Sequence, residues 1–267
     1  MEPPAGRSTF VTSADGTRIH VSTAGSGPPL VLVHGTAGNH ARWLGLRPLL
    51  EARLTVHALD RRGRGASGDA ADYDIAREFE DVAAVVDAVA AASDEPVAVY
   101  GHSFGGLCAL AATGLTRRID RLVLYEPPST VDDGSQRLPL AQLVAAGRRE
   151  EALETFLRVE VGMSDDELAA LREMSDWWQP RLAMIDTIVR EYEADLAQAL
   201  TTARLEDGAP PTLLLIGSDS PADYRTELSA LAQRYGWQLA ALAGQAHIAD
   251  ISAPELVAEP LLNFVLG

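Results

Sequence analysis

The sequence of 267 residues lacks lysine entirely and contains a single cysteine, Cys108. One cysteine cannot form an internal disulfide and nothing requires an oxidising compartment, so we expect a cytoplasmic protein. The segment Met1–Thr17 has charges and turn-forming residues but no apolar stretch typical of a secretory signal. Apolar runs such as Leu213–Ile216 have the length of strands, well short of the roughly 20 residues that cross a membrane. These absences predict a protein that does not insert into membranes.

The net charge is strongly negative. Arginine supplies all 22 basic residues, against 38 acidic ones, which gives a formal net charge of −16. So acidic a chain offers no extended surface for a phosphate backbone, and we expect no nucleic-acid partner. The hydrophobic fraction of 47% excludes a disordered or collagen-like chain, and the length allows one large domain or two small ones.

Strand and helix patterns alternate along most of the chain. A predicted hairpin, Phe10–Thr12 with Arg18–Ser22, is followed by apolar runs typical of buried parallel strands: 30–33, 54–59, 97–100, 122–125 and 212–216. A last strand is predicted at 238–242. Val82, Val85, Val86 and Val89 have the spacing of an amphipathic helix. The alternation predicts an α/β fold, with a mostly parallel central sheet flanked by helices.

One stretch, from about 129 to 209, has helical patterns but no convincing strand. Ile185, Ile188, Val189, Tyr192 and Leu196 predict one of its helices, and Ser164 with Glu167 predicts a capping box at the start of another. We therefore expect a helical cap at 129–209, inserted between strands 6 and 7 of a core formed by 1–128 and 210–267. Such insertions tend to cover the carboxyl edge of the sheet, where ligands bind.

The strongest motif is Gly101-His102-Ser103-Phe104-Gly105, with a buried strand before it and a helix after it. In that setting G-x-S-x-G holds a serine on a sharp turn, above the sheet and at a helix N-terminus. Ser103 is therefore the candidate nucleophile.

A serine needs a base, and His247, in the loop after the last predicted strand, is the best placed of six histidines. The base needs a carboxylate, and two contenders follow strands at the same sheet edge: Glu126 and Asp219. Asp250, three residues after His247, is interpreted as the N-cap of the final helix.

An oxyanion requires two hydrogen-bond donors. We expect them to be the backbone amides of Phe104, directly after the serine, and of Thr36, in the loop that follows the strand at 30–33. Gly35 would let the backbone approach the substrate closely. Gly35, His102, Trp177 and Trp178 are the predicted substrate contacts, the tryptophans from the cap.

Together these residues resemble the α/β-hydrolase fold superfamily, in its branch with a serine nucleophile. The resemblance rests on His34-Gly35, the serine motif, His247 and Asp60-Arg61-Arg62-Gly63-Arg64-Gly65-Ala66-Ser67, which is similar to the family's D-x-R-G-x-G-x-S turn. It covers nearly the whole chain. Gly63-x-Gly65-x-x-Gly68 also spells a dinucleotide fingerprint, but it follows a late strand, so we expect no nucleotide cofactor.

The chain departs from the family at the acid. The family's commonest acid comes three residues after a glycine, where Gly217-Ser218-Asp219-Ser220 has Ser220. A branch resembling haloalkane dehalogenases instead has its acid at the end of the sixth strand, where Glu126 stands. The comparison slightly favours Glu126 and leaves Asp219 open.

The predicted function is that of a serine hydrolase, without cofactor or metal, which cleaves a small carboxylic ester, lactone or thioester with an apolar acyl group. The histidines are scattered and no H-E-x-x-H motif occurs, which disfavours a metal site. A lyase, acyltransferase or cyclase on the same scaffold is the alternative, and a ligand-binding receptor is a weaker one. The sequence indicates neither the substrate nor the oligomeric state.

Overall fold

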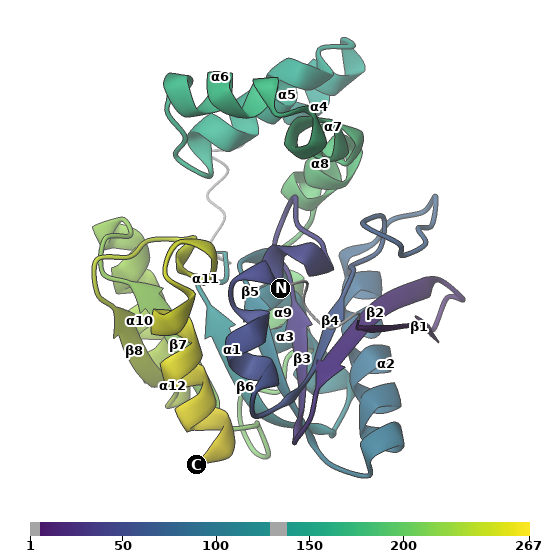
Figure 1. Ribbon diagram of the computed structural model, residues 1–267, viewed down its shortest axis with the longest axis vertical. Helices are drawn as coiled ribbons and strands as arrows, with labels where there is room; N and C mark the ends of the chain where they lie inside the picture. The colour runs from purple at the N-terminus through teal and green to yellow at the C-terminus, as the bar shows by residue number, and fades with distance from the viewer. Residues whose placement is uncertain (1–5, 129–137) are drawn as a thin grey trace. The chain divides into compact units, whose positions relative to one another are not determined.

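A computed structural model describes residues 6–128 and 138–267 (Figure 1). Within these residues, eight strands form one sheet in the order β1-β2-β4-β3-β5-β6-β7-β8. The strands are β1 (Arg7–Thr12), β2 (Arg18–Gly25), β3 (Pro29–Val33), β4 (Thr55–Leu59), β5 (Val97–His102), β6 (Ile119–Tyr125), β7 (Thr212–Gly217) and β8 (Gln238–Leu242). The hairpin β1–β2 and the pair β2–β4 are antiparallel, and every other pairing is parallel. The mostly parallel sheet confirms the predicted fold class.

The apolar runs are strands because both faces of the sheet are covered. Every residue of β3, β5 and β7 is buried. On one face α1 (Arg47–Glu51) packs against α12 (Pro254–Leu266), and on the opposite face α2 (Ile75–Ser93) packs against α3 (Phe104–Leu115) (Figure 1). A continuous core joins the strands to α1 and α12 and includes the fully buried Trp43 of the 3-10 helix η1 (His40–Leu44).

Contacts divide the chain into two compact units. One contains Met1–Val131 and Leu196–Gly267, and the other contains Asp132–Asp195. The start of the cap, predicted at 129, lies outside the described residues. The short helix α9 (Ala197–Thr202) falls inside the predicted cap range but packs against α3, within the unit that holds the sheet.

The second unit is a set of helices that pack on one another. They are α4 (Leu140–Ala145), α5 (Arg149–Val159), α6 (Asp165–Glu173), α7 (Ser175–Ala183) and α8 (Ile185–Glu193), and α5 contacts all the others. The predicted capping box is present, because Ser164 Oγ accepts from the Glu167 amide and Glu167 accepts from the Ser164 amide. The helix predicted to reach Leu196 ends at Glu193 instead, and Leu196 is the N-cap residue of α9.

Two helices complete the sheet unit. Between β7 and β8 runs α10 (Ala222–Tyr235), and the single-turn α11 (Ala249–Ser252) follows the loop after β8. Among the described residues, no helix has the length and apolar character needed to traverse a bilayer.

Candidate active site

Ser103 lies on a strained turn between β5 and α3. Its backbone has φ 52° and ψ −130°, a conformation that L-residues rarely adopt. The flanking glycines make this turn possible: a Cβ on Gly105 would lie 2.4 Å from the Val33 and His34 carbonyl oxygens, and one on Gly101 would lie 2.6 Å from the Gly106 Cα. The motif therefore occurs in the strand–turn–helix setting that gives it chemical meaning.

The two backbone amides predicted to bind an oxyanion belong to segments that approach Ser103. Phe104 is the first residue of α3, and Thr36 follows Gly35 in the loop after β3. Neither amide donates to a protein acceptor within the described ranges. The Gly35 backbone lies so close to the serine that a Cβ there would be 2.9 Å from Ser103 Cβ. The residues predicted for the oxyanion hole therefore lie on the two segments that meet at Ser103.

His247 is paired with a carboxylate. Its Nδ1 lies 2.8 Å from Glu126 Oε2, across 121 positions of sequence. A carboxylate can only accept, so Nδ1 carries the proton and Nε2 is left as a base. The His247 ring is 4.7 Å from the ring of His102, the residue before Ser103. No hydrogen bond joins Ser103 to His247 in the part of the chain that the structure describes; in unliganded sites such contacts are often loose.

The carboxylate of Glu126 is built into the site from several sides. Oε1 accepts from the Gly217 amide at 2.8 Å and from Ser220 Oγ at 2.5 Å. Burial raises the pKa of Glu126, but hydrogen bonds from His247, Ser220 and Gly217 outweigh burial and hold its pKa below the ordinary value. Glu126 is thus an ionised partner for the histidine.

Asp219, the other contender, does not meet His247. Its side chain is exposed and accepts from the neighbouring Ser218 Oγ at 2.9 Å. The residue at the family's usual acid position, Ser220, instead donates its hydroxyl to Glu126. The end of β6 therefore supplies the carboxylate, and the end of the neighbouring β7 supplies hydrogen bonds to it.

The loop that carries His247 is fixed by the ends of β5 and β6. The His247 carbonyl accepts from His102 Nε2 at 2.8 Å. Tyr125 Oη donates to the Ala246 carbonyl and accepts from the Ala249 amide. His102 is only 2% exposed and its Nε2 is directed at the backbone of His247. This placement indicates that His102 holds the loop of His247 in place, and it disfavours the substrate contact predicted for His102.

Asp250 is not the N-cap of the final helix, contrary to the interpretation from sequence. Ala253 precedes α12, whereas Asp250 lies in the first turn of α11 and is fully buried. Its two oxygens accept from Arg42 Nε at 2.6 Å and Nη2 at 2.8 Å. The pattern of a polar residue before a helix looked like a cap because the sequence does not show the distant arginine.

His34 supports the loop of Thr36. Its Nδ1 donates to the Gly35 carbonyl at 2.8 Å, and its Nε2 accepts from the Arg61 amide at 3.0 Å. Burial, together with the charge of Arg61, lowers the pKa of His34 to about 3, so the ring is neutral. It therefore acts as a structural strut and not as a base.

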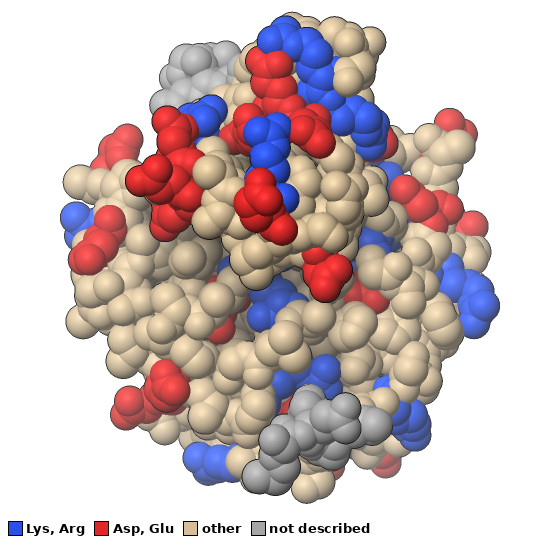
Figure 2. All heavy atoms as spheres, turned by 45° about the horizontal axis from the view of Figure 1, so that its top comes forward, with Lys and Arg blue, Asp and Glu red and all other residues tan. Residues whose placement is uncertain are grey.

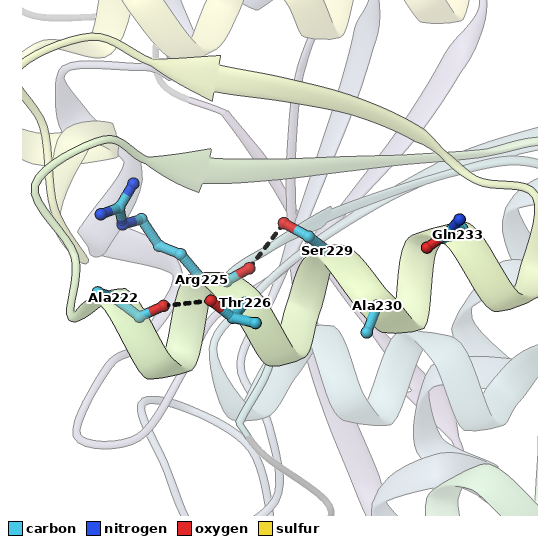
Figure 3. Close-up of a pocket in the computed structure, with 6 residues that line it drawn as sticks. All are labelled: Ala222, Arg225, Thr226, Ser229, Ala230 and Gln233. Atoms are coloured by element: carbon cyan, nitrogen blue, oxygen red, sulfur yellow. Dashed lines mark hydrogen bonds between the residues drawn. The ribbon is translucent and has the colours of Figure 1, made fainter.

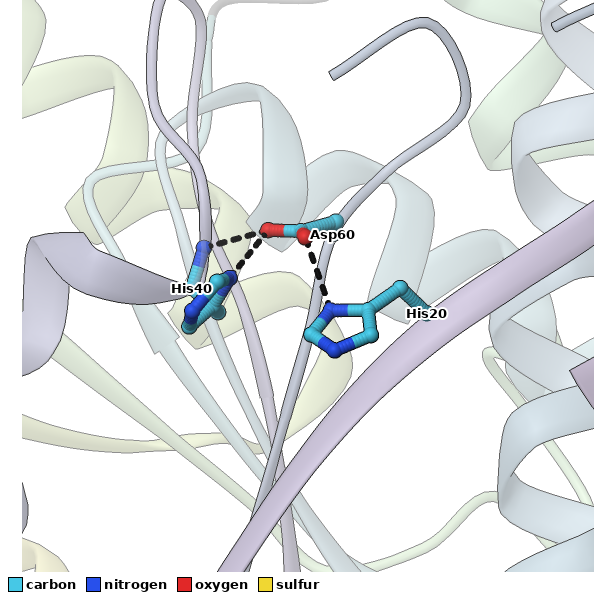
Figure 4. A group of neighbouring side chains, drawn as sticks. All are labelled: His20, His40 and Asp60. Carbon is cyan, nitrogen blue, oxygen red and sulfur yellow. Dashed lines mark hydrogen bonds and ion pairs between the residues drawn. The ribbon is translucent and has the colours of Figure 1, made fainter. Parts of the chain in front are cut away.

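Asp60 anchors two further histidines (Figure 4). Oδ2 lies 2.8 Å from His20 Nδ1, and Oδ1 lies 2.8 Å from His40 Nδ1. The His40 and Ala66 amides also donate to this carboxylate. Each oxygen thus accepts two hydrogen bonds, which fixes the start of η1 to the turn after β4 and satisfies the carboxylate without an added ligand.

The two tryptophans predicted to contact substrate lie in α7. Trp178 is 1% exposed, and Trp177 is half-buried beneath the guanidinium of Arg181, which is 3.8 Å from its ring centre. Their ring centres are 6.4 Å apart. Substrate contact by either tryptophan stays a prediction.

A surface hollow runs along α10 and contains none of the candidate residues (Figure 3). Its lining is Ala222, Arg225, Thr226, Ser229, Ala230 and Gln233. The Thr226 and Ser229 hydroxyls donate to carbonyls of their own helix, so they are already engaged.

This fold, with Ser103 on the sharp turn between β5 and α3, is that of an α/β hydrolase. The family model described as "Alpha/beta hydrolase family" matches residues 30–259, and the chain belongs to that family.

Known proteins of the family include esterases. An α/β hydrolase of Sphaerobacter thermophilus has 33% identity and a TM-score of 0.77 over 96% of this chain and 100% of its own. The pimeloyl-[acyl-carrier protein] methyl ester esterase of Aeromonas hydrophila is 27% identical over 92% of this chain and 99% of its own length. An esterase of Exiguobacterium antarcticum, at 22% identity and a TM-score of 0.74 over 98% of this chain and 100% of its own, shares the fold.

Coverage differs among relatives. The chain spans only 35% of the length of the first curated relatives it matches, uncharacterised mycobacterial proteins such as one from Mycobacterium bovis. That match has 35% identity over 125 residues, or 45% of this chain.

Proposed function

We propose that the protein is a serine hydrolase that cleaves a small carboxylic ester, lactone or thioester through an acyl-enzyme. The observation that carries the proposal is the 2.8 Å contact of His247 Nδ1 with the buried Glu126, which leaves Nε2 as a base beside the turn of Ser103. Esterases among the relatives support ester chemistry, with the ester of the Aeromonas relative belonging to that protein.

The reaction would proceed in two halves. Ser103 Oγ attacks the substrate carbonyl while His247 Nε2 takes its proton, and the Thr36 and Phe104 amides receive the negative oxygen. Collapse breaks the bond to the leaving alcohol or thiol, which takes the proton from His247. Water then attacks the acyl-enzyme with His247 again as base, and releases the acid and Ser103.

Glu126 would contribute by its charge and orientation. It keeps the proton of His247 on Nδ1, so that Nε2 accepts from the serine, and it stabilises the imidazolium that forms as the serine attacks. Its lowered pKa keeps it ionised at neutral pH.

Covalent labelling tests the proposal. A fluorophosphonate should label the wild type once, and Ser103→Ala should abolish both labelling and hydrolysis of p-nitrophenyl acetate. Ser229→Ala, in the hollow of α10, is the matched control and should label normally. A wild type that takes no label would refute a serine hydrolase. Transfer of the acyl group to an added alcohol in preference to water would instead indicate an acyltransferase.

A further inference from the structure

The ion pair of Arg42 and Asp250 lies beside the candidate base but outside the triad. We propose that these two are positioning residues. They hold the loop of His247 in place against η1, the helix that follows the loop of Thr36. The inference rests on the proposed function, since it concerns the same site of Ser103 and His247.

The pair is buried and joined at two points. Both Asp250 oxygens are engaged, by Arg42 Nε at 2.6 Å and by Nη2 at 2.8 Å, and the Asp250 side chain is fully buried while that of Arg42 is 13% exposed. A two-point contact between planar groups fixes their orientation as well as their distance. It joins residues that are 208 positions apart, on η1 and α11.

Each partner is adjacent in sequence to a core residue. Trp43, next to Arg42, is fully buried, with its ring edge-on to Tyr100 at 5.5 Å. Ala249, next to Asp250, is fully buried in the same core. Close-packed cores do not deform freely. The pair therefore links α11, and with it His247, to the part of the core that contains Trp43.

The pair also reaches the histidine loop through His102. Arg42 Nη2 is 3.5 Å from His102 Nε2, the atom that faces the His247 carbonyl at 2.8 Å. A carbonyl only accepts, so His102 Nε2 carries a proton, and it meets Arg42 as donor against donor. Burial and then the Arg42 charge hold the pKa of His102 well below its usual value, so His102 is a neutral strut.

Asp250 neutralises the arginine in this arrangement. Without its charge, the Arg42 cation would face a loop whose histidine becomes positive only in the transition state. An interaction that acts mainly in the transition state changes kcat and leaves KM nearly unaltered. A purely structural pair would not produce this separation.

The test compares Asp250→Asn, Arg42→Gln and the double variant with p-nitrophenyl acetate as substrate. We expect Asp250→Asn to lower kcat by on the order of 100-fold, as small displacements of catalytic groups do, with KM within about twofold of wild type. The double variant removes both charges and should recover about tenfold in kcat over Asp250→Asn.

Asp81→Asn is the matched control. Asp81 of α2 is paired with Arg62 by the same two-point contact, at 2.7 Å for both atoms, and its side chain is 2% exposed; among the described residues it hydrogen-bonds to Arg62 and Ser13, not to the loops of Thr36 or His247. Folded Asp81→Asn should keep kcat within about threefold of the wild type. An equal loss in Asp81→Asn, or unchanged kcat in both folded single variants, would overturn the inference.

A spectroscopic measurement separates this inference from the proposed function. The His247 Nδ1 proton, hydrogen-bonded to Glu126, should give a far-downfield resonance without substrate, and Arg42→Gln and Asp250→Asn should shift or broaden it while Asp81→Asn should not. An unchanged resonance in a folded Arg42→Gln would refute the positioning role even if Asp250→Asn fails to fold. Absence of fluorophosphonate labelling in the wild type would refute only the hydrolase.

Discussion

Two non-glycine residues of the candidate site, Ser103 and Glu126, have positive φ, at 52° and 43°. Each such conformation costs on the order of 1–3 kcal/mol and persists only where the surrounding fold enforces it. Both follow a parallel strand directly, β5 and β6, at the sheet edge that also holds the loop of His247. Backbone strain therefore coincides with the two residues to which the proposed function gives the roles of nucleophile and acid.

The acid assignment gives the first prediction. Glu126→Gln keeps the shape of the side chain but removes its charge and its control of the His247 proton, so kcat should fall on the order of 10³–10⁴-fold. Asp219→Asn, an exposed carboxylate in the next loop, should stay within a few-fold. Steady-state hydrolysis of p-nitrophenyl acetate measures both. A larger loss for Asp219→Asn would reverse the assignment.

The sequence could not decide between these two acids. Glu126 and Asp219 both follow a strand, and both come after Ser103 and before His247. What separates them is the direction of a side chain at a strained backbone position, which depends on the contacts of Gly217 and Ser220 across two strands. Residue type and order identified Ser103 and His247 as candidates, whereas Arg42 and Tyr125 gave no local signal.

A second residue-scale prediction concerns acid stability. His34 has a folded-state pKa of about 3 against an ordinary value of 6.5, so in acid the unfolded chain takes up a proton there before the folded one does. This contribution to stability is complete above about pH 6.5 and declines as the pH falls toward 3, by at most about 1.4 kcal/mol per pH unit.

Urea denaturation of His34→Gln at several pH values would test this. Glutamine can make both hydrogen bonds of His34 but does not titrate, so the fall in unfolding free energy between pH 6 and 4 should be shallower than in wild type. The difference measured at pH 8, where the imidazole is neutral in both states, is the reference. Parallel curves for the two proteins would contradict the prediction.

At the scale of elements, α9 is the helix whose place the sequence did not indicate. It lies inside the predicted cap, yet it packs on α3 in the sheet unit. Gly114 of α3 allows this approach, since a Cβ there would lie 1.7 Å from the Thr202 carbonyl oxygen. The buried strands were predictable because a parallel sheet covered on both faces requires continuous apolar runs. The partner of a short helix depends on such long-range contacts, which have no period in the sequence.

Gly114→Ala tests that contact. The added methyl group forces α9 away from α3, and the free energy of unfolding should fall by roughly 1–3 kcal/mol, the usual cost of overpacking. Gly45→Ala is the control, because among the described residues a Cβ there meets only the Pro254 side chain, with Cγ at 3.4 Å and Cβ at 3.7 Å, and should change stability little. Urea midpoints give both values, and equal midpoints for Gly114→Ala and wild type would show that α9 yields without cost.

At the scale of the whole molecule, the charge of −16 is distributed among paired side chains as well as unpaired ones. Figure 2 shows a largely tan face on which red and blue side chains lie next to one another in places and singly elsewhere. In the helical unit Arg149 pairs with Asp186, Arg158 with Asp165 and Arg172 with Glu150. Exposed pairs of this kind each contribute little to stability, typically 0–1 kcal/mol. The acidic side chains in excess of the arginines repel one another, and this repulsion destabilises the folded state.

Salt should therefore stabilise the protein at pH 8. Raising NaCl from about 10 to about 150 mM shortens the range of repulsion and should raise the Tm by a few degrees. Near pH 4.7, the isoelectric point expected from the sequence, the same addition should have no stabilising effect. Scanning calorimetry at both pH values measures this, and an equal rise at the two pH values would show that the gain does not come from net charge.

The buried Cys108 allows the opening of α3 to be measured by thiol modification. It lies in α3, five residues after Ser103, in a chain with no other thiol and no lysine. A disulfide reagent can reach the buried thiol only when α3 opens. The rate at which Cys108 is modified in the native protein therefore measures how often α3 opens. Cys108 thus reports on the helix that follows Ser103. Any substrate, inhibitor or substitution that stabilises the turn of Ser103 should lower the rate of Cys108 modification.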